Sequence, residues 1–134
     1  MESEPTDHDD LHGPFTRLIG MDYVEASGER VVATWTAEER HHQPFGIVHG
    51  GVHASIVETL ASIGGFLWLD GDGHCVGVNN NTDFYRPVST GNLVSTATPV
   101  HQGRSQQVWV VETRDDQDRL VARGQVRLQN LRKG

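Results

Sequence analysis

The chain is poor in cysteine, and we expect neither a leader segment nor a membrane span. Its 134 residues contain one cysteine, Cys75, so no internal disulfide can form and a cytoplasmic location is the simpler expectation. The opening MESEPTDHDDLHG is polar and acidic, unlike a signal peptide. No uninterrupted apolar run reaches about 18 residues, the length that a spanning helix needs.

Positive charge is also scarce. The sequence has eleven Lys and Arg residues against 18 Asp and Glu residues, which gives a formal net charge of -7. Such a chain does not favour nucleic acid or an anionic membrane surface, and an anionic ligand would need a local Arg or Lys patch. The sequence has no G-x-S-x-G element, no P-loop and no dinucleotide fingerprint.

The order of elements predicts an α+β fold. We expect a disordered acidic tail at residues 1–10 and a single domain at residues 11–134. A short helix ends at Gly20, and Val31, Ala33, Trp35 and Ala37 then alternate as on a half-buried strand. A long apolar helix follows at about residues 51–69. Four strand-like segments come last, at residues 75–88, 91–103, 104–116 and 118–130. The predicted sheet is antiparallel and wraps the helix.

The long helix carries one narrow polar stripe. Most of its surface is apolar, which predicts a buried helix. Gly51, Ser55, Glu58 and Ser62 have the spacing i, i+4, i+7 and i+11, within roughly 60° of one another on the helical wheel. A lone helical Glu more often faces solvent or pairs with Arg. In a small polar groove, however, Glu58 becomes a candidate nucleophile or general base.

The helix opens with His49-Gly50-Gly51, which has the make-up of an oxyanion hole. The first turn of a helix has free N–H groups and a positive dipole end, and glycine lets another group come close. The alternative is that the glycines only turn the loop into the helix. The pair Gly64-Gly65 later in the helix predicts close packing against the sheet.

Reach along the helix predicts a dimer. Gly50 and Glu58 are eight residues apart, which is about 12 Å along the axis. A Glu side chain cannot span that distance to act on a carbonyl held at Gly50 of the same chain. If both residues serve one reaction, they come from different subunits of a two-fold homodimer.

The stretch HQPFGIVHGG, with Glu58 eight positions after Gly50 and Ser62 four later, resembles the hotdog-fold acyl-CoA thioesterases. The branch that it most resembles contains the Arthrobacter-type 4-hydroxybenzoyl-CoA thioesterase and the 1,4-dihydroxy-2-naphthoyl-CoA hydrolase. The resemblance covers about residues 14–130. It implies an antiparallel sheet around one long central helix, in a dimer that is often paired into a tetramer.

The resemblance also implies roles for individual residues. The Gly50 N–H would polarise the thioester carbonyl, and Gln43 and His49 would help to place that carbonyl or the glycine loop. Glu58, from the opposite subunit, would attack the thioester carbon or activate water, and Ser62 would orient the water or the Glu. Residues that would bind substrate or coenzyme A are Gly51, Tyr85, Arg86, Pro87, Val88, Gly103, Arg104, Ser105 and Gln106, with Arg86 and Arg104 as phosphate partners.

The sequence thus predicts an acyl-CoA thioesterase that acts on an aromatic acyl group without metal or redox cofactor. Alternatives are a medium- or long-chain fatty acyl-CoA thioesterase, a hotdog hydratase, and a non-catalytic acyl-CoA-binding domain. The hydratase motif is absent, and a binder would have little reason to hold Glu58 in the stripe. Acyl-carrier protein in place of coenzyme A, and a covalent or a general-base route, stay open.

A metal site is the remaining hypothesis, and it is weak. His49 and His53 have the i, i+4 spacing of a helical metal pair, yet no third ligand has a convincing spacing. We therefore expect no metal. Cys75 has no basic neighbour except His74, which predicts an inert thiol.

Overall fold

The computed structural model describes residues 11–134, so the tail expected at residues 1–10 lies outside the described part. Helix α1 (Pro14–Ile19) is followed by strands β1 (Asp22–Ala26) and β2 (Val31–Ala37), the short 3-10 helix η2 (Glu39–His41) and the long helix α2 (Gly50–Leu69). The chain then continues through strands β3 (His74–Phe84), β4 (Gly91–Gln102), β5 (Gln106–Asp115) and β6 (Leu120–Leu131).

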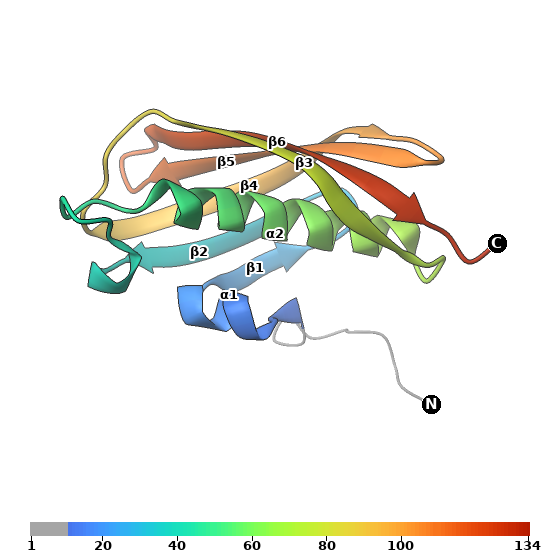
Figure 1. Cartoon of the computed structure of the whole chain (residues 1–134), viewed down its shortest axis with the longest axis horizontal. Coiled ribbons are helices and arrows are strands. Elements are labelled where there is room, and N and C mark those ends of the chain that lie inside the picture. Colours follow the sequence, from blue (N-terminus) through green and yellow to red (C-terminus); the bar gives the residue numbers. More distant parts are fainter. Residues whose placement is uncertain (1–10) are drawn as a thin grey trace.

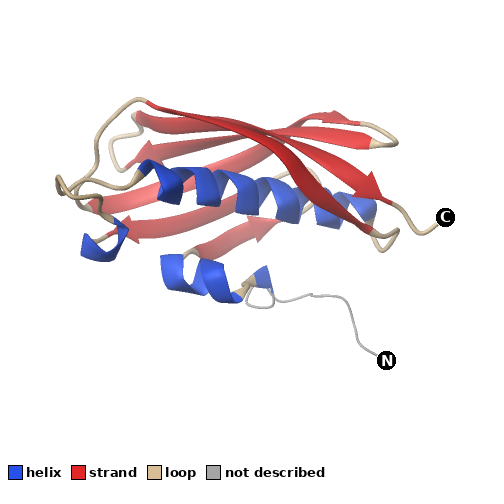
Figure 2. Ribbon diagram, in the orientation of Figure 1, coloured by secondary structure: helices blue, strands red, loops and turns tan. Residues whose placement is uncertain are grey.

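The six strands form one antiparallel sheet in the order β1-β2-β4-β5-β6-β3. The sheet curls along α2, which lies lengthwise against its concave face (Figure 1). The strands curve around this helix, with β3 crossing in front of its second half, and α1 lies beside its first half (Figure 2). The predicted α+β class and the hotdog arrangement, a sheet wrapped around one long helix, are confirmed.

Alternation along the strands explains why one face of the sheet covers the helix. On β6, Val126 and Leu128 are fully buried, whereas Arg123, Gln125 and Arg127 are exposed. Successive side chains of a strand point to opposite faces, so the apolar set meets α2 and the charged set meets water. The predicted inward residues of β2 are all buried as well.

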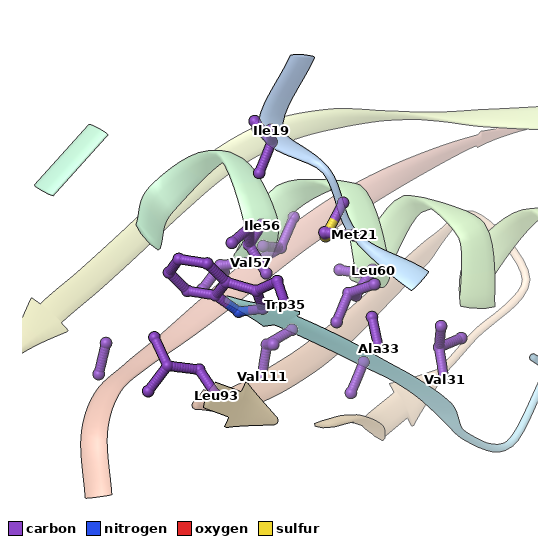
Figure 3. Close-up of a cluster of buried hydrophobic side chains, with 14 of the residues drawn as sticks. Ile19, Met21, Val31, Ala33, Trp35, Ile56, Val57, Leu60, Leu93 and Val111 are labelled. Atoms are coloured by element: carbon purple, nitrogen blue, oxygen red, sulfur yellow. The ribbon is translucent and has the colours of Figure 1, made fainter. Parts of the chain in front are cut away.

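The core lies between α2 and the sheet (Figure 3). Ile56, Val57 and Leu60 of α2 are fully buried and face the strands. Trp35 of β2 is buried among them, and its indole N–H donates to the Ser95 hydroxyl at 3.1 Å, so the polar end of the ring is satisfied. The packing fixes which face of α2 turns away from the sheet.

Gly64 allows the close approach of α2 to the sheet that the sequence predicts. A Cβ atom at this position would lie 2.4 Å from the ring of Trp109, which is fully buried on β5. The Trp109 indole N–H donates to Gln107 Oε1 at 2.8 Å, and Gln107 Nε2 donates to the Gly65 carbonyl at 3.2 Å. Helix and sheet are therefore joined by both packing and hydrogen bonds.

The opposite face of α2 is open. Glu58 is exposed, and Val52, Ile63 and Leu67 are only partly buried. The prediction of a helix buried on nearly all sides is therefore wrong for a single chain, because the sheet covers only one side. By length and composition alone α2 could cross a membrane, but half of that window is buried inside the fold, as is typical of a core helix.

The ends of α2 follow local signals. The helix begins at Gly50, one residue before the predicted start, because His49 acts as its N-cap. It ends at Leu69, and the next residue, Asp70, is left-handed with φ 49° and lies inside the predicted DGDG turn. The other predicted turn, at residues 115–118, joins β5 and β6, with Asp118 at φ 60°.

Candidate active site

The loop before α2 places Gln43 beside the start of the helix. Its two arms pair at His42 and Val48, and the Gln43 N–H donates to the Ile47 carbonyl at 2.8 Å. The Val48 N–H donates to the Val88 carbonyl at 2.8 Å, which ties the loop to the segment after β3. The result is an open pocket of about 330 Å³, the Gly50 pocket, lined by Gln43, Ile47, Val48, Gly50, His53, Phe84, Tyr85, Arg86 and Pro87.

Gly50 offers a free donor to this pocket. It is the first residue of α2, and its N–H has no acceptor among residues 11–134. The next N–H, on Gly51, donates to His49 Nδ1 at 2.7 Å. Of the two predicted glycine positions, only Gly50 therefore has an N–H available for a substrate oxygen. A Cβ at Gly50 would lie 2.8 Å from the ring of Phe84, so a side chain there would meet the pocket wall.

His49 and Gln43 act on the loop through their side chains. Because His49 Nδ1 accepts a backbone N–H, the hydrogen of its neutral ring lies on Nε2. Gln43 Oε1 accepts the Phe45 N–H, which orients the amide within the pocket wall. Both contacts fit the predicted role of holding the glycine loop, and the direct contact to a substrate carbonyl stays a prediction.

Glu58 lies in a different pocket. It points over β3, where the Asn80 amide donates to Glu58 Oε1 at 3.4 Å and to the Ala54 carbonyl at 3.0 Å. A Cβ at Gly77 would lie 3.6 Å from the Glu58 carboxyl carbon, and β3 has a bulge between Gly77 and Asn79. This second pocket, the Glu58 pocket, has a volume of about 210 Å³ and is lined by Phe15, Ala54, Ser55, Glu58, Thr59 and Asn80.

The other members of the stripe differ in what they can do. The Ser55 hydroxyl donates to the Gly51 carbonyl at 2.7 Å, so it is used within the helix. Ser62 lies one turn after Glu58 and is partly exposed. Its hydroxyl forms no hydrogen bond with the described residues, and the catalytic role predicted for it stays a prediction.

Sequence reasoning missed Asn80 and Phe15. Asn80 belongs to an Asn-Asn-Asn run on β3, and a polar run in a predicted strand was the available signal. Phe15 is 60% exposed on α1, although it is a large aromatic residue, and it lines the Glu58 pocket. Their contact with Glu58 depends on tertiary packing, which helix spacing alone does not give.

The structure divides the predicted coenzyme-A residues between the two ends of α2. Tyr85, Arg86 and Pro87 line the Gly50 pocket, while Val88 is partly buried against the core. The Gly103–Gln106 turn lies at the other end of the molecule (Figure 1). It is next to Gly65, about 22 Å further along the helix axis from Gly50.

Two basic residues that the sequence analysis did not select lie near this turn. Arg132 Nε donates to the Arg104 carbonyl at 2.9 Å and pairs with Asp72 at 2.8 Å, and Lys133 follows it. Neither Arg86 nor Arg104 forms an ion pair within the described part of the chain. Unpaired guanidinium groups suit phosphate oxygens, but the two lie too far apart in one chain to hold the same phosphate.

The weak metal hypothesis gains no support. His53 is 4% exposed and packs against Trp35, with ring centroids 5.7 Å apart, whereas the His49 ring caps the helix. Among residues 11–134, no group of three or more His, Cys, Asp or Glu could hold a metal ion. Burial raises the pKa of the Cys75 thiol to about 11, which agrees with an inert cysteine.

Comparisons with known proteins identify the class. The sequence profile of the Thioesterase superfamily matches residues 45–122. The chain is 46% identical over 121 residues to protein Rv1847 of Mycobacterium tuberculosis, covering 88% of this chain and 86% of that one. It is 36% identical over 108 residues to the proofreading thioesterase EntH of Cronobacter turicensis, covering 80% of this chain and 78% of that one.

Solved structures agree with this result. The structure of Rv1847 matches with a TM-score of 0.88, covering 91% of this chain and 99% of that one at 46% identity. The crystal structure of AziG from S. sahachiroi also matches with a TM-score of 0.88, covering 90% and 98% at 50% identity. The chain therefore belongs to the Thioesterase superfamily, and the prediction of a hotdog-fold thioester hydrolase is confirmed.

Proposed function

We propose that the protein hydrolyses aromatic acyl-CoA thioesters at a site shared by two subunits. The free Gly50 N–H of one subunit donates to the thioester oxygen, and Glu58 of the other reaches the carbonyl carbon. Glu58 either attacks that carbon, which expels coenzyme A and leaves an anhydride that water opens, or takes a proton from an attacking water. Neither route needs a metal or redox cofactor.

The observation that carries the proposal is the separation of Gly50 and Glu58 into two pockets of one chain. Each pocket holds half of the required chemistry. The Gly50 pocket has an N–H donor and no carboxylate, and the Glu58 pocket has a carboxylate held by Asn80. A second copy of the chain in antiparallel arrangement joins the two halves twice, which gives two equivalent sites.

The open face of α2 supports a two-fold partner. A two-fold axis that places Gly50 beside Glu58 of the partner subunit passes α2 midway between these two positions, at Ala54. Gly51 and Ser55, next to it on the open face, are small as well, and small residues let two helices approach closely.

The edge of the sheet supports the same partner. β3 is eleven residues long and pairs on one side with β6, and its other side is unpaired within residues 11–134. Val76 and Val78 on this strand are 42% and 47% exposed. A long edge strand with exposed apolar side chains is a ready surface for pairing with another chain.

Charge supports coenzyme A as the carrier. The chain is acidic overall, yet Arg104, Arg132 and Lys133 gather around the turn between β4 and β5. In the proposed dimer, the Arg86 side of one subunit faces the Arg104 end of its partner, so basic groups from both would flank the anionic carrier. An aromatic acyl group fits the flat walls that Phe84 and Tyr85 give to the Gly50 pocket.

The test is release of free thiol from a panel of benzoyl-, dihydroxynaphthoyl-, phenylacetyl- and fatty acyl-CoA. Cys75 gives little background because burial keeps its thiol protonated. We expect turnover to be fastest on the aromatic members. Faster turnover of fatty acyl-CoA would mean that the substrate is a fatty rather than an aromatic acyl group. Binding of the panel without turnover would favour a non-catalytic acyl-CoA-binding domain.

A further inference from the structure

His53 is a buried histidine that the proposed hydrolysis does not use. It is 4% exposed, and its Nδ1 is enclosed without a hydrogen-bond partner among residues 11–134. A buried polar atom without a partner destabilises a fold, because it has lost its hydrogen bonds to water and gained none in return. A ring nitrogen kept in this state calls for an explanation.

The neighbouring His41 shows that this fold can satisfy a buried histidine. His41 Nδ1 accepts the Glu38 N–H at 3.0 Å, and its Nε2 donates to the Ile19 carbonyl at 2.8 Å. His53 packs close to the same tryptophan, Trp35, yet it has no comparable pair of bonds.

His53 also lies in the wall of the Gly50 pocket. It follows Gly50 by three residues, which is about 4.5 Å along the axis and on nearly the same side of the helix. Its ring lies 6.0 Å from that of Phe84, the exposed aromatic residue that covers this part of the pocket. A half-turn of the ring about its Cβ–Cγ bond exchanges Nδ1 with a carbon and preserves the packing.

The ring is neutral at physiological pH. Burial, with a smaller electrostatic contribution from His41, lowers the pKa of His53 to about 4. A neutral imidazole has one donor and one acceptor and no charge to attract a carboxylate. The group that it suits is a hydroxyl, because a hydroxyl can both donate and accept.

We propose that His53 is a specificity-determining residue that hydrogen-bonds a hydroxyl on the acyl group bound in the Gly50 pocket. This inference rests on the proposed function. A site that holds a polar group for a substrate hydroxyl discriminates against the analogue that lacks it, because the polar group then stays unpaired.

The experiment compares benzoyl-CoA with its 2-, 3- and 4-hydroxy derivatives. We expect the wild-type protein to prefer one hydroxylated isomer in kcat/KM by about tenfold or more. His53→Phe keeps an aromatic ring and removes both nitrogens, so we expect it to lose most of that preference, measured as the ratio of kcat/KM between the preferred isomer and benzoyl-CoA. His53→Asn keeps a polar atom near the Nδ1 position, so we expect it to retain part of the preference.

Binding of non-hydrolysable ketone analogues of the preferred isomer and of benzoyl-CoA gives a second readout. It works in the wild-type protein alone, through the ¹⁵N shift of the His53 ring, so a variant that fails to fold does not end the test. We expect the ring shift to change with the hydroxylated analogue only.

The inference would be overturned by no hydroxyl preference in the wild type, by a preference unchanged in His53→Phe, or by a ring shift that is the same with both analogues. An equal loss of kcat/KM on all substrates in His53→Phe would also overturn it, since that loss would mean that His53 maintains the fold or contacts the carrier. Failure of the proposed function is distinct, because it would appear as no thioester hydrolysis by the wild type, and the binding readout would still decide the role of His53.

Discussion

Gly50 and Glu58 lie on the same helix and open into two different pockets, one against Phe84 and the other against Asn80. About 12 Å of helix rise separates them. A thioester held at one cannot be reached by the other in a single chain. The catalytic proposal therefore depends on a second subunit as much as on either residue.

Replacement of Glu58 tests the chemistry directly. Glu58→Gln keeps an oxygen that can accept the Asn80 amide and removes the charge, so we expect kcat to fall roughly 10²–10⁴-fold with little change in stability. Glu29→Gln, at an exposed turn, is the matched control and should keep wild-type turnover. Near-normal kcat in Glu58→Gln would show that Glu58 takes no part in the reaction.

Gly50→Ala tests the approach to the oxyanion site. The added methyl group would lie 2.8 Å from the Phe84 ring, which must then swing and reshape the pocket. We expect kcat/KM to fall by about tenfold or more, and the fall to be smaller when Phe84→Ala is already present. Equal falls in both backgrounds would mean that the methyl group acts on the substrate rather than through Phe84.

The sequence predicted the elements well because their signals are local. Alternation predicts a half-buried strand by itself, as at Val31, Ala33, Trp35 and Ala37. The glycine pair at Gly64 likewise predicts close packing by itself. The open face of α2 was not predictable in the same way, because apolar periodicity does not tell whether the sheet or a partner chain covers a given side.

The site residues show the same limit. Glu58 and Gly50 stand out by spacing on one helix. Asn80 and Phe84 do not, because their contacts depend on the register of β3 and on its bulge near Gly77. The burial of His53 likewise follows from tertiary packing, so its sequence spacing with His49 was misleading.

Gly64→Ala tests the packing of α2 on the sheet. In an exposed helix this change stabilises by about 1 kcal/mol. Here the methyl group would meet the buried Trp109 ring at 2.4 Å, so we expect a loss of roughly 1–3 kcal/mol in the free energy of unfolding, measured by denaturant titration. In a Trp109→Phe background the nearest ring atoms are gone, and the cost should shrink. Stabilisation by Gly64→Ala alone would contradict the packing described.

The pKa of His53 predicts a pH dependence of stability. It is lowered from 6.5 to about 4 in the folded protein, so between these values the unfolded chain binds more protons. The free energy of unfolding therefore falls as the pH drops from about 6.5 to 4, on the order of 3 kcal/mol in all. Denaturant titrations across this range should show a shallower fall in His53→Phe, and an unchanged fall in the control His74→Phe, which alters an exposed residue. If the free energy of unfolding falls equally with pH in all three proteins, groups other than His53 cause the pH dependence.

The most direct test of the shared site is subunit complementation. Gly50→Val and Glu58→Ala each disable one half of the proposed site, so each variant alone should be nearly inactive. After the two are unfolded together and refolded, half of the dimers are mixed, and each mixed dimer holds one intact site. We expect about a quarter of wild-type activity to return. A mixture that forms mixed dimers yet stays as inactive as its parents would contradict a site built from two subunits.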